Sequence, residues 1–170
     1  MNKIKDIDKL LEKLSSSGEE QVFDICLLML TSGLRLAEII NIKFSDINFT
    51  TGTLQAKLVK RGLSNEEKIK INLNDISLIH LAKIRYKYPD NKWVFQARKS
   101  NNRINKLPYC LSSQTVMDKV RLANQHLEHK ISINSFRGAY STNYSPGMLD
   151  IKSTLVHKSI NMTSKYIKDE

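Results

Sequence analysis

Hydrophobic residues recur at helical spacing through the first forty positions of the chain. Five of them predict a first amphipathic helix: Ile4, Ile7, Leu10, Leu11 and Leu14. Ser17 with Glu20 forms a capping-box pattern that predicts the start of a second helix. This second helix runs toward Thr31 and is apolar on nearly every side, so we expect it at the centre of the molecule. Gly33 predicts its C-terminal cap, and a short helix over Leu36–Asn41 follows.

The pattern changes to a period of two in the middle of the chain. Residues 46–49 predict a short strand, and a turn at 50–52 leads into strands over 53–60 and 67–73. The second of these long strands alternates polar with apolar residues, which predicts one solvated face carrying Lys68 and Lys70.

Helical patterns return in the second half. Asn74 is typical of an N-cap, and four residues predict the apolar stripe of its helix: Ile76, Ile79, Leu81 and Ile84. Ser112 or Ser113 predicts the cap of a helix to about Lys130, and shorter helices are expected over 135–144, 149–156 and 161–167. With no repeat or linker in view, the chain is expected to form one domain, mainly α with a small antiparallel β-sheet (α+β).

The charge balance points to a polyanionic partner. The chain carries 27 Lys and Arg against 17 Asp and Glu, a formal net charge of +10. The alternative is a scatter of surface lysines of the kind that AT-rich genomes encode. Cys26 and Cys110 show neither disulfide nor zinc spacing, and Cys26 is expected to be a buried thiol. The longest apolar run, 22–30, contains Asp24 and is too short for a membrane span, so a cytoplasmic protein is expected.

Cleavage of a phosphodiester without a metal needs cations aimed at the phosphate oxygens, a nucleophile and a proton donor. Four segments stand in order, of which the first, third and fourth carry such residues: Thr31–Glu38 (TSGLRLAE), Phe44–Ile47 (FSDI), Asn134–Arg137 (NSFR) and Leu155–Tyr166 (LVHKSINMTSKY). Together they resemble the first arginine box, the Trp-Ser-Asp-Ile segment, the His-x-x-Arg box and the Leu-Gly-His…Thr-x-x-Tyr segment of the phage integrase (tyrosine recombinase) family. His157 precedes Tyr166 by nine positions, the usual family spacing.

The resemblance implies the fold of a DNA breaking-rejoining enzyme and a role for each matching residue. Tyr166 would attack the DNA backbone, form a 3′-phosphotyrosyl link and release a 5′-hydroxyl. Arg35 and Arg137 would clamp the scissile phosphate, and Glu38, one helical turn after Arg35, would orient that guanidinium. His157 would hydrogen-bond the phosphate or assist proton transfer. No cofactor or metal is implied.

The family's lysine lies in the hairpin after the first arginine box and protonates the leaving 5′-oxygen. Lys60 fits its usual place best, and Lys57 is the alternative. Asn134 stands where the family usually has His, and Val156 where it usually has Gly. Because an amide cannot accept a proton at neutral pH, we expect Asn134 to slow cleavage, with water or another group taking the tyrosine proton.

The resemblance also sets expectations for organisation and partners. Residues 1–170 would form a single catalytic domain without the family's N-terminal core-binding domain, either as a fragment of a longer integrase or as a minimal recombinase that inverts promoter segments. Double-stranded DNA would be the partner in the bacterial cytosol, with nucleoid association and possible accessory DNA-bending proteins. A tetrameric synapse would form on DNA, but with four residues after Tyr166 no stable tetramer is expected without it.

Two other functions compete with recombination. An integrase remnant, weakened or inactive, would act as a DNA-binding module, and charge and helicity fit that reading as well. A metal-dependent nuclease is disfavoured because the sequence has no compact carboxylate cluster. A basic loop around Arg98, Lys99, Arg103 and Lys106 would either track the DNA backbone or be a solvated loop. The same strand exchange serves integration, excision, inversion and resolution of a mobile genetic element.

Overall fold

The computed structural model describes residues 3–59, 67–98 and 108–143. Its helices are α1 (Lys3–Ser16), α2 (Glu20–Ser32), α3 (Leu36–Ile40), α4 (Asp75–Lys87), α5 (Ser113–Ala123) and α6 (Ile133–Asn143), with short 3-10 turns η1 (Phe44–Asp46) and η2 (Asn124–His126). Its strands are β1 (Ile47–Asn48), β2 (Thr53–Lys57) and β3 (Lys68–Asn72). This confirms the predicted class, mainly helical with one small antiparallel sheet.

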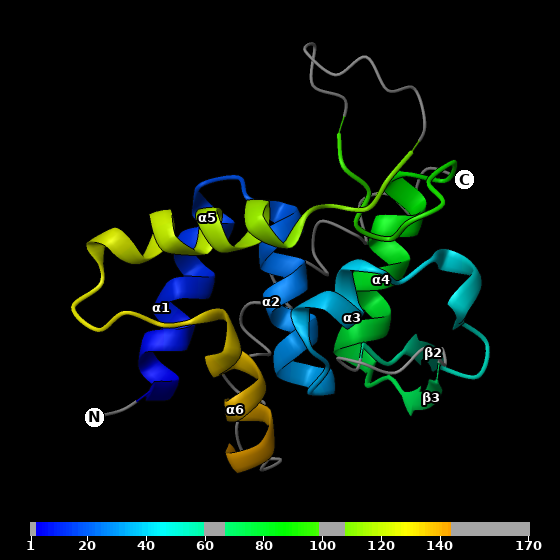
Figure 1. The fold of residues 1–170 in the computed structure, drawn as a ribbon, viewed down its shortest axis with the longest axis horizontal. Helices are drawn as coiled ribbons and strands as arrows, with labels where there is room; N and C mark the ends of the chain where they lie inside the picture. Colours follow the sequence, from blue (N-terminus) through cyan, green and yellow to red (C-terminus); the bar gives the residue numbers. More distant parts are fainter. Residues whose placement is uncertain (1–2, 60–66, 99–107, 144–170) are drawn as a thin grey trace, which may run out of the picture.

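Helix α2 lies at the centre, as its apolar sequence predicts. Nine of its residues are buried, and α1, α3, α4, α5 and α6 all pack against it (Figure 1). The core runs from the inner face of α1 through α2 to Leu81 on α4 and Val116 on α5. None of the helices in the part of the chain described by the structure has the length and hydropathy needed to cross a membrane.

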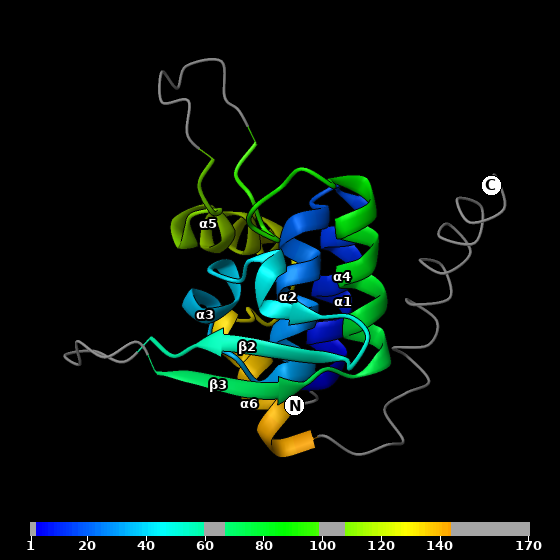
Figure 2. The ribbon, with the colours of Figure 1, turned by 90° about the vertical axis from the view of Figure 1, so that its right-hand side faces the viewer.

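The sheet has the order β1-β2-β3 and lies at one end of the helical body, next to α3 and α4 (Figure 2). Its register pairs Leu54 with Ile71 and Lys57 with Lys68. Directly paired residues project to the same face, so the two lysines lie together on the side away from buried Leu54. The predicted solvated face of the last strand is confirmed, since Lys68 and Lys70 are exposed.

The glycine cap of α2 is confirmed. Gly33 has a φ of 69°, and its N–H donates to the carbonyl of Met29 at 3.0 Å. The capping box predicted for the other end is wrong. The Ser17 hydroxyl instead donates to the Lys13 carbonyl at 2.8 Å, and α2 begins without a side-chain cap. The serine therefore satisfies the end of α1, whose last carbonyls also lack helical partners.

The buried stripe of α4 differs from the predicted one. Leu81 and Ile84 are buried as expected, but the other two buried positions are Ser77 and His80. The Ser77 hydroxyl lies 2.7 Å from that of Thr31, and His80 Nδ1 lies 2.7 Å from the Asp24 carboxylate. Because the Ser77 hydroxyl and His80 Nδ1 each have a hydrogen-bond partner on α2, α4 can bury these two side chains between the helices, although His80 Nε2 has no partner among the described residues. Asn74 caps α4 as predicted, accepting from the Ser77 N–H at 2.9 Å.

Helix α5 is shorter than predicted. Ser112 caps it, but it ends at Ala123 rather than near Lys130. Asn124 ends it because its side-chain amide donates to the Val120 carbonyl at 3.0 Å and to the Ile131 carbonyl at 2.7 Å. Its oxygen accepts from the Ile131 N–H at 2.9 Å. This buried amide ties the returning chain to α5 and sets the place where α6 begins.

Further boundaries differ from the predictions, and α3, β2 and β3 are each shorter than the ranges predicted for them. The strand expected over 46–49 is reduced to Ile47–Asn48, because the Asp46 carboxylate accepts from the Lys43 N–H at 2.9 Å and closes the η1 turn. Helix α6 begins at Ile133, two residues before the predicted start. The helices predicted over 149–156 and 161–167 lie outside the described residues.

Candidate active site

Arg35 is presented by the sharp turn between α2 and α3. Helix α2 ends at Gly33, Leu34 is buried, and Arg35 takes the N-cap position of α3 with extended backbone angles. An arginine at this position emerges from the core at the point where the chain changes direction. The first arginine box therefore places its cation at a helix junction, held by the buried residues before and after it.

Glu38 holds Arg35 from the buried side. Its carboxylate accepts from the Arg35 backbone N–H at 2.7 Å and from guanidinium Nη1 at 3.2 Å. The Glu38 side chain is 3% exposed, whereas that of Arg35 is 52% exposed. A buried carboxylate is costly unless it is paired and hydrogen-bonded, and here both bonds come from one residue. About half of the Arg35 side chain stays exposed beyond this pairing. The expected orienting role of Glu38 thus has a matching geometry.

Helix α6 carries the second arginine box. Phe136 is fully buried and anchors the helix, Arg137 is half-buried, and Asn134 is exposed in the first turn. Asn134 and Arg137 are three positions apart, so they share a side of the helix. The helix packs on α2 where the ring of Tyr140 covers Gly33. The segments with Arg35 and Arg137 therefore meet at one junction, although they are distant in sequence.

Of the two candidate hairpin lysines, Lys57 lies within the described residues and Lys60 lies outside them. Lys57 is the last residue of β2, half-buried, and sits opposite Lys68. Lys60, His157 and Tyr166 lie outside the described residues, so the structure brings together Arg35 with Glu38, and Asn134 with Arg137. Of the basic loop, Arg98 is described, and its guanidinium donates to the Tyr88 hydroxyl at 3.1 Å. Lys99, Arg103 and Lys106 lie outside.

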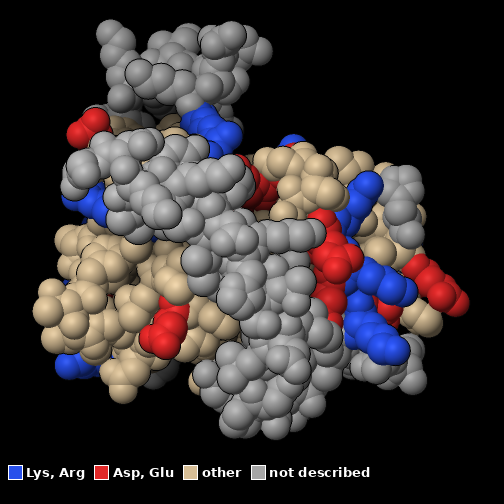
Figure 3. Space-filling view, turned by 180° about the vertical axis from the view of Figure 1, so that it is seen from behind, with Lys and Arg blue, Asp and Glu red and all other residues tan. Residues whose placement is uncertain are grey.

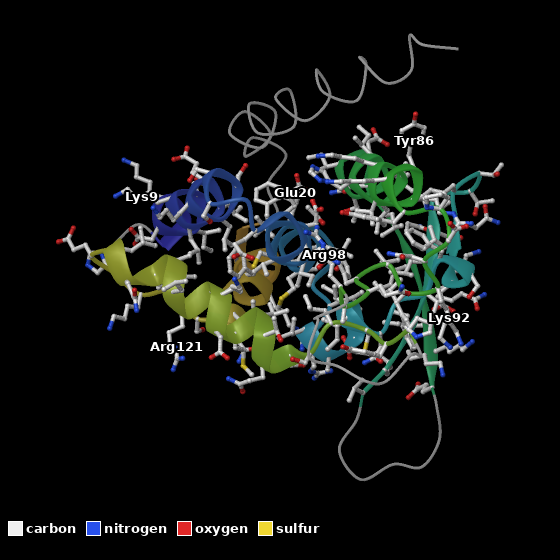
Figure 4. All side chains as sticks on the ribbon, turned by 90° about the horizontal axis from the view of Figure 1, so that it is seen from above. Lys9, Glu20, Tyr86, Lys92, Arg98 and Arg121 are labelled. Atoms are coloured by element: carbon white, nitrogen blue, oxygen red, sulfur yellow. The ribbon has the colours of Figure 1, made fainter. Side chains whose placement is uncertain are left out.

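Some basic and acidic side chains lie side by side on the described surface. On the face drawn in Figure 3, Lys and Arg lie beside Asp and Glu at one edge. One such pair joins α4 to α2, with Lys87 Nζ 2.6 Å from a Glu20 oxygen. That hydrogen bond lowers the pKa of Glu20 and raises the pKa of Lys87 from their ordinary values. Lys9, Tyr86 and Arg121 point outward from α1, α4 and α5 (Figure 4).

The sequence patterns did not indicate the contacts of two residues near this candidate site. Tyr140 lies inside a predicted helix, but no pattern indicated that its ring would cover Gly33. Asn124 lies in the middle of the helix predicted to run to about Lys130, and an asparagine at such a position is expected at the surface. Its buried amide is recognisable only once the chain has turned back on α5.

Comparison with curated proteins finds relatives over nearly the whole chain. The type 1 fimbriae regulatory protein FimB of Escherichia coli strain K12 is 24% identical over 168 residues, which cover 96% of this chain and 74% of the relative. The FimB protein of Escherichia coli O157:H7 matches to the same extent.

Solved structures share the fold. The XerA recombinase superposes with a TM-score of 0.57 at 17% identity, covering 81% of this chain and 46% of that one. The Tn1549 transposon integrase in complex with transposon right end DNA gives a TM-score of 0.57 at 16% identity, covering 86% of this chain and 57% of that one. The chain thus spans about half the length of these proteins, and the likeness confirms the expected tyrosine recombinase catalytic-domain fold.

The sequence profile of the phage integrase family covers residues 3–170, nearly the entire chain. The profile extends across both arginine boxes and across the segment with His157 and Tyr166. With the fold shared with recombinases of known structure, this match decides the classification: the chain belongs to the phage integrase family.

Proposed function

We propose that this chain is the catalytic domain of a site-specific DNA recombinase that acts through a phosphotyrosyl intermediate. The observation that carries the proposal is the state of Arg35. One edge of its guanidinium is bound to a buried carboxylate, and about half of the side chain faces solvent. An arginine held in this way is oriented before an anion arrives, so little rotamer freedom remains to be lost on binding. Its charge is still available to the phosphate.

The proposed reaction exchanges one phosphodiester for another. Water takes the proton of the Tyr166 hydroxyl as its oxygen attacks phosphorus, the bond to the 5′-oxygen breaks, and Lys60 gives that oxygen a proton. Arg35 and Arg137 neutralise the charge that develops on the non-bridging oxygens, and His157 donates a hydrogen bond to one of them. The 5′-hydroxyl of a second strand then gives its proton to Lys60 and attacks the phosphotyrosine, and the freed tyrosine regains a proton from water. Because the ester energy is conserved in the covalent link, the exchange requires no cofactor.

The proposed partner is double-stranded DNA. The net charge of +10 favours a polyanion, and the Tn1549 integrase with the same fold was solved in complex with DNA. Strand exchange between two duplexes needs several catalytic chains, so we propose self-association on DNA as a tetrameric synapse, with accessory DNA-bending proteins where the duplex must be curved.

The test of the nucleophile uses a nicked suicide duplex, in which the released 5′ fragment diffuses away and the covalent product accumulates. The native chain should give an adduct that survives SDS, and Tyr166→Phe should give none. Tyr86→Phe is the control, since it removes a hydroxyl from an exposed tyrosine on α4 (Figure 4). DNA binding without any adduct from the native chain would instead support the alternative function, a DNA-binding integrase remnant.

The choice between Lys60 and Lys57 can be made with a modified leaving group. A bridging 5′-sulfur leaves as a thiolate and needs no proton, so it restores cleavage to a variant that lacks its general acid. This substrate should restore cleavage by Lys60→Ala. It should rescue Lys57→Ala no more than Lys68→Ala, the matched variant of the residue paired with Lys57 across the hairpin. Rescue of Lys57→Ala alone would assign the proton to that residue.

A further inference from the structure

The contact between Gly33 and Tyr140 is unusually close. Gly33 ends α2 in the left-handed conformation, and a Cβ placed on it would lie 2.7 Å from Cε1 and 3.2 Å from Cγ of the Tyr140 ring, with Cδ1 nearer still. The first of these separations is shorter than real Cβ contacts allow. The aromatic ring therefore lies directly on the backbone of the α2 cap, and any side chain at position 33 would push it away.

This contact lies between the two arginine-bearing segments. Arg35 follows Gly33 by two residues, and Arg137 precedes Tyr140 by three, which puts it one turn away on the same side of α6. The views agree that α6 runs beside α2, and the two helices are in contact (Figures 1 and 4). A displacement of α6 at Tyr140 would thus carry Arg137 with it, whereas Arg35 stays with α3 and Glu38.

The ring is poorly placed to serve mainly as a core residue. Tyr140 is 36% exposed, whereas Phe136, one turn earlier, is fully buried and attaches α6 to the core. Burial of Phe136 holds the helix to the molecule, and the Tyr140 ring sets how closely its second half approaches α2. The attachment of the helix and its spacing from α2 are therefore carried by different side chains.

We propose that Gly33 and Tyr140 are positioning residues that set the separation of Arg35 and Arg137 for phosphate binding in the transition state. The inference rests on the proposed function, because it concerns the rate of the same cleavage step. Reacting groups must be held within a fraction of an ångström, and a shift of about 1 Å can reduce a rate roughly a hundredfold. Gly33→Ala should therefore lower the rate of adduct formation at saturating DNA about 10- to 100-fold. The half-saturating DNA concentration should change little, since both cations remain.

Gly18 supplies a matched control. It also has a left-handed backbone, with a φ of 75°, but nothing lies within 4 Å of the Cβ that alanine would add. Gly18→Ala thus imposes the same kind of backbone strain without displacing a neighbour, at a turn outside the proposed site. The cleavage rate of folded Gly18→Ala should stay within about twofold of the native rate, while both alanine variants lose thermal stability.

The chain of 170 residues and the nicked duplex serve for the test, which is arranged as a double-mutant cycle. In the Tyr140→Ala background the ring is gone, so Gly33→Ala should reduce the rate by less than about twofold further. Tyr140→Phe keeps the ring and should retain the native rate even if Gly33→Ala fails to fold, whereas Tyr140→Ala should lose rate severalfold. Equal effects of Gly33→Ala in both backgrounds, or a native rate for Tyr140→Ala, would overturn the positioning role alone. Failure of the native chain to form any adduct would overturn the proposed function and this inference with it.

Discussion

Glu38 binds Arg35 on its buried side, so the exposed half of the arginine side chain stays in solvent. The carboxylate is buried and bonds to both the backbone and the side chain of the arginine, so α3, its N-cap and the guanidinium form one unit. At the second box, Asn134 is exposed and lacks the proton-accepting capacity of a histidine. At the residue scale, the proposed cleavage rate therefore depends on the orientation of Arg35 by Glu38 and on whether residue 134 can accept a proton.

Replacing Glu38 tests the orienting role. Glu38→Gln keeps an acceptor but removes the charge, and we expect adduct formation to slow about tenfold and the free energy of unfolding to fall by about 1–2 kcal/mol. The control is Asp118→Asn, which likewise removes only the charge, from another i, i+3 pair in which Asp118 is 46% exposed and Arg121 80% exposed. An exposed pair of this kind contributes about 0.5 kcal/mol or less. Similar losses in the two variants would count against a role for Glu38 in catalysis.

Asn134 offers a gain of function. A histidine there could accept the tyrosine proton near neutral pH, so Asn134→His should cleave the nicked duplex faster than the native chain above pH 6.5 or so. The rate should rise with pH through the imidazole pKa. Asn134→Gln, which keeps the amide, should show no such rise. If Asn134→His cleaves no faster than the native chain, the asparagine does not limit the rate of cleavage.

Because the Cys26 thiol is buried, we expect the folded chain to lose stability at alkaline pH. Burial raises the pKa of its thiol well above the ordinary value of roughly 8.5. Above that pH the unfolded chain releases this proton and the folded chain keeps it, so the free energy of unfolding should decrease by about 1.4 kcal/mol per pH unit. Urea unfolding from pH 8 to 10 would measure the slope, and Cys26→Ala should reduce it. A thiol reagent should modify half-buried Cys110 in the native chain and Cys26 only after unfolding.

At the scale of elements, the site depends on how helices end and meet. Gly33 ends α2 and allows α6 to approach, and the Asn124 amide ends α5 and fixes the start of α6. The α2–α4 interface buries two hydrogen-bonded polar pairs at its centre and adds the Lys87–Glu20 pair at its surface. Because the surface pair is half-exposed, its small contribution should disappear as the pH falls through the lowered pKa of Glu20.

Loss of the Asn124 amide should loosen the connection between α5 and α6. Asn124→Ala leaves the N–H and the carbonyl of buried Ile131 without this partner, which should cost about 2–3 kcal/mol of unfolding free energy. Asn74→Ala is the matched control, since it loses a single helix-capping bond worth about 1 kcal/mol. Urea midpoints at constant slope give both values. If Asn124→Ala is no less stable than Asn74→Ala, the amide does not secure the start of α6.

At the scale of the whole molecule, the charge balance is consistent with the proposed DNA partner. The chain carries a formal net charge of +10. On the face drawn in Figure 3, however, acidic side chains lie beside basic ones at one edge, so the proposed attraction to DNA depends on where the cations gather against the duplex.

DNA affinity should therefore depend steeply on salt. If the chain neutralises roughly six to ten phosphates, its affinity should fall by about three to five orders of magnitude between roughly 50 and 200 mM salt. Fluorescence anisotropy with a labelled duplex would measure the slope of log affinity against log salt. Duplexes of unrelated sequence should show a similar slope, because phosphate contacts carry little sequence information. A nearly flat dependence would contradict an electrostatic mode of binding.

Local rules anticipated much of this protein. The αL cap at Gly33, the N-cap at Asn74 and the alternation of β3 follow from backbone geometry and side-chain periodicity over a few residues. The ordered boxes ending at Tyr166 were enough to indicate the family that the profile later matched. Short-range patterns suffice for such features because the backbone conformations that compete there are decided by residues within one or two helical turns of each other.

Packing settled what those patterns left open. Ser17 could cap α2 or bond to the end of α1, and the two choices are nearly equal locally. Asp24 and His80 pair across 56 positions, Glu38 is buried under Arg35, and Tyr140 meets Gly33 from the far end of the described chain. Each of these contacts depends on which helices lie side by side, and that arrangement minimises exposed apolar surface over the whole core rather than over any one segment.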